Sequence, residues 1–142
     1  MSDQAAALPK ISLWSTALFA VVSVLTFLTA DSLDQLFAVF CGLLFFVGTI
    51  LLGLGLWNGI QRSRQDSVTL AGLLSVSSAH VPSKVRNVLW AAVVVQTALA
   101  VLFAALRPFT QQAFGVLVPV LGLGMAALWG SRFAEFFPRD DP

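Results

Sequence analysis

Charged residues are scarce in this sequence. Only 11% of its 142 residues are charged, against about 25% in a typical soluble domain, and 58% are apolar, against about 45–50%. A soluble domain of this length has too much surface for its volume to bury that surplus, so part of it must face something other than water. The composition predicts a single domain, residues 1–142, embedded in a lipid bilayer.

Cysteine and histidine each occur once, as Cys41 and His80. One cysteine excludes a disulfide within the chain, and the two residues together are too few for an ordinary metal site without another chain. The net charge is +1, and the basic residues are scattered rather than gathered in a stripe. We therefore expect no metal, no cofactor and no nucleic-acid partner.

Four stretches contain no Asp, Glu, Lys, Arg or His: residues 13–30, 36–57, 88–106 and 113–129. As helices they would be roughly 26 to 33 Å long, which brackets a hydrocarbon core of about 30 Å. The apolar runs are continuous rather than alternating, and in lipid only a helix or a closed barrel satisfies its own backbone. We expect an all-α membrane protein whose four transmembrane helices form two antiparallel hairpins with short outer turns.

The basic residues predict the orientation of these spans. One side of the topology holds seven, and the other holds only Arg107; the seven are Lys10, Arg62, Arg64, Lys84, Arg86, Arg132 and Arg139. Because short cytoplasmic loops retain Lys and Arg, we expect both termini and the loop 58–87 to be cytoplasmic. A cleaved signal peptide is the alternative for the first span, but its apolar run exceeds the roughly 7–15 residues of a signal core.

The tryptophans give an independent indication, because indole side chains prefer the headgroup level of a bilayer. Each predicted span has one at its inner end, and we interpret all four as interface anchors: Trp14, Trp57, Trp90 and Trp129.

Small residues recur at helical spacing in the second and fourth spans. They are Cys41, Gly48, Gly55 and Gly59 in the second, and Gly115, Gly122, Ala126 and Gly130 in the fourth, where Pro119 predicts a kink. Lipid provides little hydrophobic drive between helices, so close backbone approach along such faces supplies the contact. We expect the two faces to meet each other in a four-helix bundle; a docking face for another chain is the alternative.

Polar side chains near the middle of the spans are few: Ser23, Thr49, Gln96 and Thr97. Gln96 is expected to turn inward and to form a hydrogen bond worth about 1 kcal/mol with a neighbouring helix, although a role in a transport path is the alternative. At the inner surface four basic residues are candidate contacts for anionic lipid headgroups: Arg62, Arg64, Lys84 and Arg86. The alternative is that they only set the topology.

The two halves of the chain share short patterns. Leu13-Trp14 recurs as Leu89-Trp90, and Leu52-Gly-Leu-Gly55 recurs as Leu121-Gly-Leu-Gly124. These matches predict a parallel internal repeat, with chance similarity between apolar runs as the alternative. Between the halves, residues 66–80 form either a short helix on the inner leaflet, capped by Asp66-Ser67, or an ordered loop.

The closing part of the chain carries a resemblance. Phe114-Gly-Val-Leu-Val-Pro119, Leu121-Gly-Leu-Gly124 and Leu128-Trp-Gly-Ser-Arg132 resemble small uncharacterised integral membrane proteins of actinobacteria. The resemblance covers about the last fifth of the chain. It implies a multi-pass protein of the cell (plasma) membrane, and it assigns no activity and no functional residue.

Intramembrane enzymes and proton-coupled carriers usually hold an Asp, Glu, His, Lys or Arg inside a span, and none of the four stretches has one. No Ser, His and Asp arrangement is assignable either, so we expect no enzyme. The leading interpretation is an accessory, assembly or stabilising subunit of a larger membrane complex, or a homo-oligomer, whose partners are the lipid bilayer and another membrane protein or itself. The alternative is a small transporter or flippase component that requires a second chain.

Overall fold

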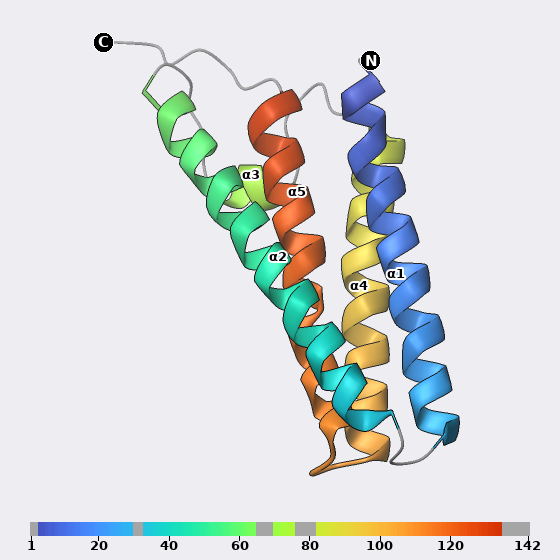
Figure 1. The fold of residues 1–142 in the computed structure, drawn as a ribbon. Helices are drawn as coiled ribbons and strands as arrows, with labels where there is room; N and C mark the ends of the chain where they lie inside the picture. Colours follow the sequence, from blue (N-terminus) through green and yellow to red (C-terminus); the bar gives the residue numbers. More distant parts are fainter. Residues whose placement is uncertain (1–2, 30–32, 65–69, 76–81, 135–142) are drawn as a thin grey trace.

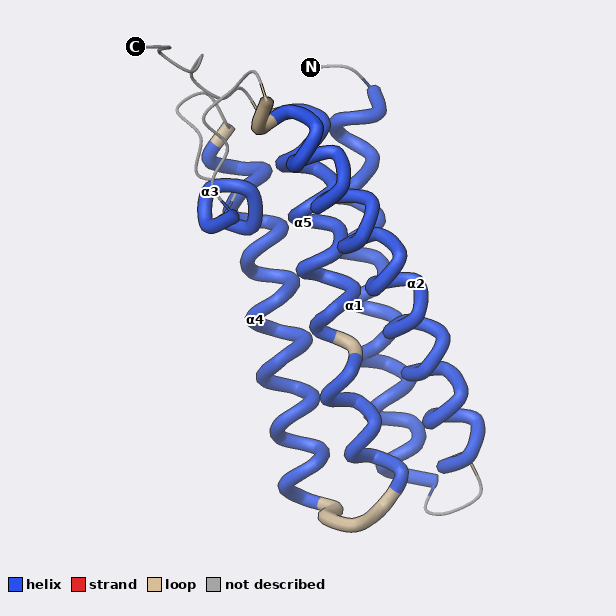
Figure 2. Tube along the Cα trace, turned by 90° about the vertical axis from the view of Figure 1, so that its left-hand side faces the viewer, coloured by secondary structure: helices blue, strands red, loops and turns tan. Residues whose placement is uncertain are grey.

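The computed structural model describes residues 3–29, 33–64, 70–75 and 82–134, and the regular elements in this part of the chain are all helices (Figure 1, Figure 2). They are α1 (Asp3–Thr29), α2 (Asp34–Arg62), α3 (Leu70–Ser75), α4 (Ser83–Leu106), the 3-10 helix η1 (Gln111–Leu117) and α5 (Pro119–Phe133). Four segments are long and apolar enough to cross a membrane: Ala6–Thr29, Asp34–Arg62, Ser83–Leu106 and Gln111–Phe133. The predicted helical class with four membrane-length segments is confirmed for these residues.

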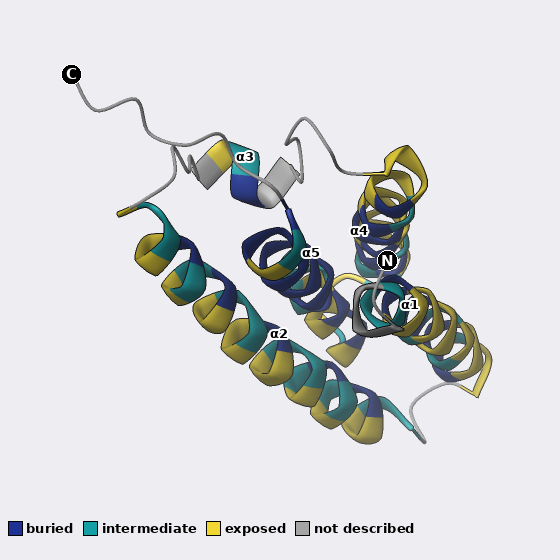
Figure 3. Cartoon of the chain, turned by 90° about the horizontal axis from the view of Figure 1, so that it is seen from above, coloured by how far each residue is buried: buried dark blue, intermediate teal, exposed yellow. Residues whose placement is uncertain are grey.

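α5 is the central helix of the bundle. α2 lies along one side of it, α4 and α1 lie on another side, and α3 packs near its C-terminal end (Figure 3). α1 and α4 run in one direction, and α2 and α5 run in the other (Figure 1). We call the end of the bundle near α3 the α3 end and the opposite end the η1 end. The helices differ in how much of their surface the bundle covers. Of the 18 residues in the apolar part of the fourth span, 61% are buried, whereas in the corresponding part of α2 only 17% are buried.

The main contact of the bundle joins α2 and α5, which approach at the level of their backbones. A Cβ atom added to Gly48 would lie 2.5 Å from the backbone nitrogen of Leu121, and one added to Gly55 would lie 2.7 Å from the carbonyl carbon of Ala127. A Cβ on Gly124 would collide with the carbonyl oxygen of Gly48. Glycine is therefore required at these positions because the facing backbone occupies the space of a side chain.

The predicted pairing of the two small-residue faces is confirmed for the face of α2 and wrong for that of α5. The face of α2 does pack on α5, but the glycine it meets there is Gly124, which was not in the predicted set. Gly122 instead faces Val93 and Gln96 of α4, and Gly130 faces the carbonyl oxygen of Leu73 in α3. The reason is geometric: α5 is surrounded on several sides, so its small residues serve different neighbours around the helix.

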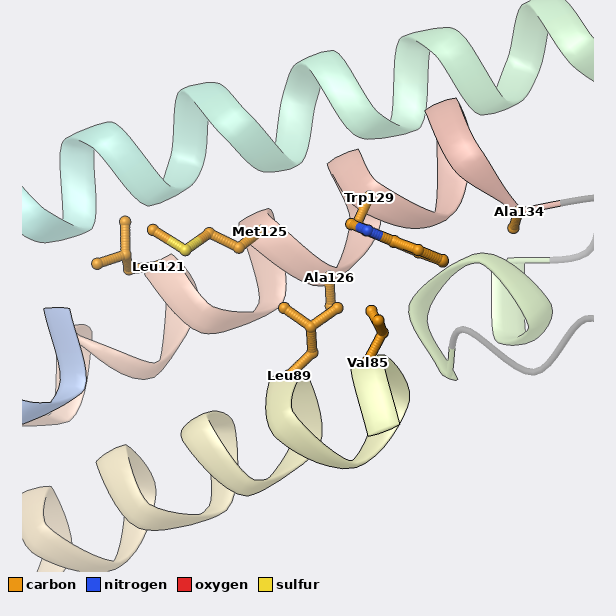
Figure 4. Packing of buried hydrophobic residues seen from close by; sticks show 7 residues of the cluster. All are labelled: Val85, Leu89, Leu121, Met125, Ala126, Trp129 and Ala134. Carbon is orange, nitrogen blue, oxygen red and sulfur yellow. The ribbon is translucent and has the colours of Figure 1, made fainter. Parts of the chain in front are cut away.

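The remaining predicted packing residues are buried in separate places. Cys41 belongs to a core cluster near the η1 end with Phe19, Phe37, Ala100 and Val118, and Gly115 lies in ordinary contact with Phe19 and Phe37. Ala126 belongs to the cluster that α5 forms with α4 (Figure 4), whose members are Val85, Leu89, Leu121, Met125, Ala126, Trp129 and Ala134. Gly59 faces the side chain of Leu73.

The fourth span changes helix type at Pro119. Before it, the backbone N–H of Val118 donates to the carbonyl oxygen of Gly115 at 3.0 Å, three residues back, as in a 3-10 helix. Proline has no N–H, and its ring clashes with the carbonyl four residues earlier, so an α-helix begins at Pro119 but does not run through it. The kink expected from the sequence is thus a junction between η1 and α5.

The segment between the halves contains a short helix, α3, within the predicted range 66–80. Leu73 is almost fully buried, and it packs against Gly59 of α2 and Gly130 of α5, so this residue anchors α3 on the bundle. The proposed cap Asp66-Ser67, the residues around His80 and Arg139 lie outside the described residues.

The glycine contact predicts opposite effects at two positions of the same helix. Gly48→Ala is expected to lower the free energy of unfolding by about 1–3 kcal/mol, because the added methyl must displace the backbone of α5. Gly53 has no atom within 4 Å of its Cβ position, so Gly53→Ala is expected to raise the free energy of unfolding by up to about 1 kcal/mol. Reversible unfolding in mixed detergent micelles, followed by circular dichroism, measures both; equal effects would contradict the packing described.

Candidate functional site

The buried face of α1 is lined mainly by small polar side chains. Ser12, Thr16, Ser23 and Thr26 are buried together with Phe19 at alternating spacings of four and three residues. Three of the hydroxyls donate to carbonyl oxygens four residues back: Thr16 to Ser12 at 2.8 Å, Ser23 to Phe19 at 2.7 Å and Thr26 to Val22 at 2.8 Å. Their own helix thus satisfies these groups, and the small side chains permit close packing against neighbouring helices in lipid.

Gln96 of α4 forms a hydrogen bond to this row and lies beside a third helix, α5. Its side chain is fully buried, and its Nε2 donates to Thr16 Oγ1 at 2.8 Å. The hydroxyl of Thr16 in turn donates to the carbonyl oxygen of Ser12. On the other side, Gln96 Oε1 lies against α5, 2.9 Å from the position that a Cβ atom on Gly122 would occupy. Gln96 therefore acts as a buried polar bridge between α1 and α4, next to the backbone of α5.

Gln112, in η1, is the second fully buried amide. Its Oε1 and Nε2 have no hydrogen-bond partner among the described residues, and the same holds for Gln96 Oε1 and Ser12 Oγ. A buried amide without partners costs free energy, and the cost is greater in a setting of low polarity. Gln112 is therefore the least satisfied polar side chain of the bundle interior described here.

The four predicted intramembrane polar residues fall into two groups. Ser23 and Gln96 face the interior. Thr49 and Thr97 lie on exposed faces, where the hydroxyl of Thr49 donates to Phe45 O at 2.9 Å and that of Thr97 to Val93 O at 2.8 Å. A threonine on the lipid side thus satisfies its hydroxyl within its own helix and needs no partner across the bundle.

The tryptophans all lie toward the α3 end, but they do not share one environment. Trp14, Trp57 and Trp90 are 78%, 62% and 37% exposed, as residues at a membrane surface would be. Trp129 is only 2% exposed and packs within the core cluster (Figure 4). The centre of its ring lies 5.9 Å from that of Phe133. The interpretation of Trp129 as an interface anchor is wrong, because α5 is central and the end of this helix faces protein.

The basic residues predicted to meet lipid also differ. Arg62 is half-buried, and its Nη1 donates to the carbonyl oxygens of Ser131 and Ala134, each at 3.0 Å. These carbonyls belong to the C-terminal end of α5, where a helix has unpaired acceptors and a partial negative charge. Arg62 therefore joins the ends of α2 and α5, while Arg64, Lys84 and Arg86 are exposed.

The chemistry open to the buried polar row is hydrogen bonding. Its members are Ser12, Thr16, Ser23, Thr26, Gln96 and Gln112, none of which titrates near neutral pH. Within the described ranges no three His, Cys, Asp or Glu side chains gather as metal ligands, and Cys41 is a buried free thiol. The arrangement suits positioning of helices rather than proton transfer or covalent chemistry.

Sequence reasoning missed Ser12, Thr16, Thr26 and Gln112. The first three lie on the same face of α1 as Ser23 and Phe19, and the alternation of three and four residues is the spacing of a helix seam. That spacing was a usable signal. Gln112 had none, because it was the last residue of the predicted outer turn, residues 107–112, and its burial depends on the 3-10 geometry of η1.

Comparison of the chain with models of protein families, with curated proteins and with solved structures found no match. The resemblance of the closing stretch to small actinobacterial membrane proteins stays a prediction.

The two buried amides are expected to respond differently to removal. Gln96→Leu should lower the free energy of unfolding by about 0.6–1 kcal/mol, the usual value of one interhelical hydrogen bond in a membrane protein. Gln112→Leu should leave it unchanged or raise it by up to about 1 kcal/mol, because an apolar side chain of similar size replaces an unsatisfied amide. Unfolding in mixed micelles compares the two; a loss above about 1 kcal/mol for Gln112→Leu would show that this amide has a bound partner.

The link between Arg62 and α5 gives a second prediction. Arg62→Ala is expected to lower the free energy of unfolding by about 1–2 kcal/mol, since two charge-assisted hydrogen bonds to carbonyl groups are lost from a half-buried site. Arg64→Ala is the matched control, and its exposed side chain should change stability by less than about 0.5 kcal/mol. Thermal unfolding in detergent distinguishes them, and equal effects would argue against the role of Arg62.

Proposed function

We propose that this chain is a non-enzymatic multi-pass membrane protein that acts by association, as an accessory, assembly or stabilising subunit of a larger membrane complex or as a homo-oligomer. The observation that carries this proposal is a face of α2 that the bundle leaves open. Gly42, Thr49 and Gly53 share that face at spacings of seven and four residues, and no atom lies within 4 Å of the Cβ positions of either glycine.

Glycine inside a helix destabilises it by about 1 kcal/mol relative to alanine. At Gly48, Gly55 and Gly124 the close contact of two helices accounts for glycine, but no contact among the residues that the structure describes accounts for Gly42 and Gly53. Small residues on a lipid-facing helix surface allow a second helix to approach at backbone distance. A helix of another protein or of a second copy fits this face.

We also propose that the protein resides in the plasma membrane with both termini in the cytoplasm and with its spans as two antiparallel hairpins. The support is the charge distribution: Lys10, Arg62, Arg64, Lys84, Arg86 and Arg132 lie toward the α3 end, and Arg107 lies at the η1 end. The guanidinium of Arg107 lies 5.1 Å from the ring centre of Phe27, so this residue is held by an aromatic contact.

The proposed internal repeat requires α1 and α4, and likewise α2 and α5, to run in parallel, and they do (Figure 1). The repeated glycines have different surroundings, however. Gly53 faces open space, whereas its counterpart Gly122 is packed against Val93 and Gln96. If the halves arose by duplication, their packing has since diverged.

A transporter or flippase component is the second candidate function, and the buried polar row favours it, because polar side chains inside a membrane bundle line transport paths. Two features weigh against it. Gln96 is engaged with Thr16. In the described part of the chain, one cavity lies at the end of α2 and another in η1, and no residue of the buried polar row lines either of them. The first is lined by Trp57, Ile60, Gln61 and Arg64, and the second by Ala113, Phe114, Val116 and Leu117.

The association proposal predicts the behaviour of the double variant Gly42→Leu plus Gly53→Leu. The native chain is expected to migrate in mild detergent as an oligomer or with one larger membrane protein, and the double variant as a monomer, because two leucines block close approach. Size-exclusion chromatography with light scattering measures the mass, and the helical circular dichroism spectrum should not change, since both positions are open.

The matched control enlarges small residues on the exposed faces of other helices, through Ala17→Leu in α1 and Ala98→Leu in α4. It should retain the native mass. A native chain that is monomeric in both detergent and lipid nanodiscs would contradict the proposal, as would an association that survives in the glycine variant.

A further inference from the structure

A cavity of about 310 Å³ lies at the C-terminal end of α2, and its described lining consists of Trp57, Ile60, Gln61 and Arg64. Spacings of three, one and three residues place these side chains on one side of the chain as it leaves the helix. The position is the α3 end of the bundle, where the exposed tryptophans also lie. This cavity is therefore at the level where a bilayer passes from hydrocarbon to headgroups.

The lining changes from apolar to polar along the chain. Trp57 and Ile60 are 62% and 60% exposed and offer apolar surface, whereas Gln61 offers an amide and Arg64 a guanidinium. From Trp57 to Arg62, its last residue, α2 rises about 7.5 Å, and Arg64 follows two residues later. This is the scale of the region between the upper acyl chains and the phosphate of a phospholipid. The sequence of apolar and then polar side chains matches the acyl chains and then the headgroup of a phospholipid that lies alongside the helix.

Arg64 is the basic side chain suited to bind an anion here. Arg62, two residues earlier, donates hydrogen bonds to carbonyl oxygens of α5, whereas Arg64 is exposed and lines the cavity. The described lining contains no acidic side chain that would compete for the guanidinium. Charge complementarity thus favours an anionic occupant, and the exposed apolar surface of Trp57 and Ile60 favours one that has acyl chains.

We propose that this cavity binds the headgroup of an anionic phospholipid. Arg64 pairs with the phosphate, Gln61 donates to an oxygen of the headgroup or glycerol, and Trp57 with Ile60 packs along the start of the acyl chains. Among the four basic residues considered from the sequence, Arg64 is thereby distinguished from Arg62, which holds the bundle together, and from Lys84 and Arg86, which line neither described cavity.

The test is lipid titration of the delipidated full-length chain in detergent, measured by native mass spectrometry with phosphatidylglycerol and with phosphatidylcholine. Phosphatidylglycerol should bind more tightly, and Arg64→Gln should weaken its binding about five-fold, the equivalent of about 1 kcal/mol for one basic residue near a membrane surface. Trp57→Ala should weaken the binding of both lipids. Arg86→Gln is the control for the loss of one positive charge at the same end of the bundle, and it should bind as the native chain does.

Each other outcome overturns the proposal. Equal losses for Arg64→Gln and Arg86→Gln would mean attraction by net charge alone, and equal binding of both lipids would mean that the cavity does not select charge. A competition arm with inorganic phosphate identifies the source of the anion. Phosphate at millimolar concentration should not displace phosphatidylglycerol, and displacement would mean that the site takes a soluble anion instead. Circular dichroism of Arg64→Gln should match the native spectrum, because this side chain is exposed.

Discussion

The backbone contact between α2 and α5 determines how the other helices are placed. Gly48 and Gly124 leave so little space that the carbonyl oxygen of one occupies the side-chain position of the other. In lipid, helices gain little from burying apolar surface against each other, so such close contact has to supply attraction through dispersion. With α2 fixed there, α5 has its other sides free for α4 at Gly122 and for α3 at Gly130.

α1 is held by a different kind of contact, and the difference limits what the interior can do. The hydroxyl groups of Thr16, Ser23 and Thr26 are satisfied by their own helix, and Gln96 adds a hydrogen bond across to Thr16. The buried row therefore holds neutral side chains that position helices. An interior of this kind leaves the outer surfaces as the places where the protein meets other molecules, and the open glycines of α2 and the cavity beside Arg64 are both on such surfaces.

Apolar length and charge position predicted the number of spans, and the spans agree with the four membrane-length segments to within a few residues at several ends. The face of α2 that carries Gly48 and Gly55 was also predictable, because spacing along a helix fixes which side chains share a side. The neighbour that each small residue of α5 meets was not predictable. Gly122 and Gly124 are two residues apart and serve different helices, and Arg62 reaches carbonyl groups some seventy positions away.

The 3-10 geometry of η1 lengthens the fourth span. This span, Gln111–Phe133, has 23 residues, against 24, 29 and 24 in the other three. A 3-10 helix rises about 2.0 Å per residue against about 1.5 Å, so seven residues gain roughly 3.5 Å of reach. The cost appears at the same end of the bundle, where Phe109 has a φ of 65° and Gln112 is buried without partners. The stretched segment thus matches its neighbours in length while leaving local polar and backbone groups less well satisfied.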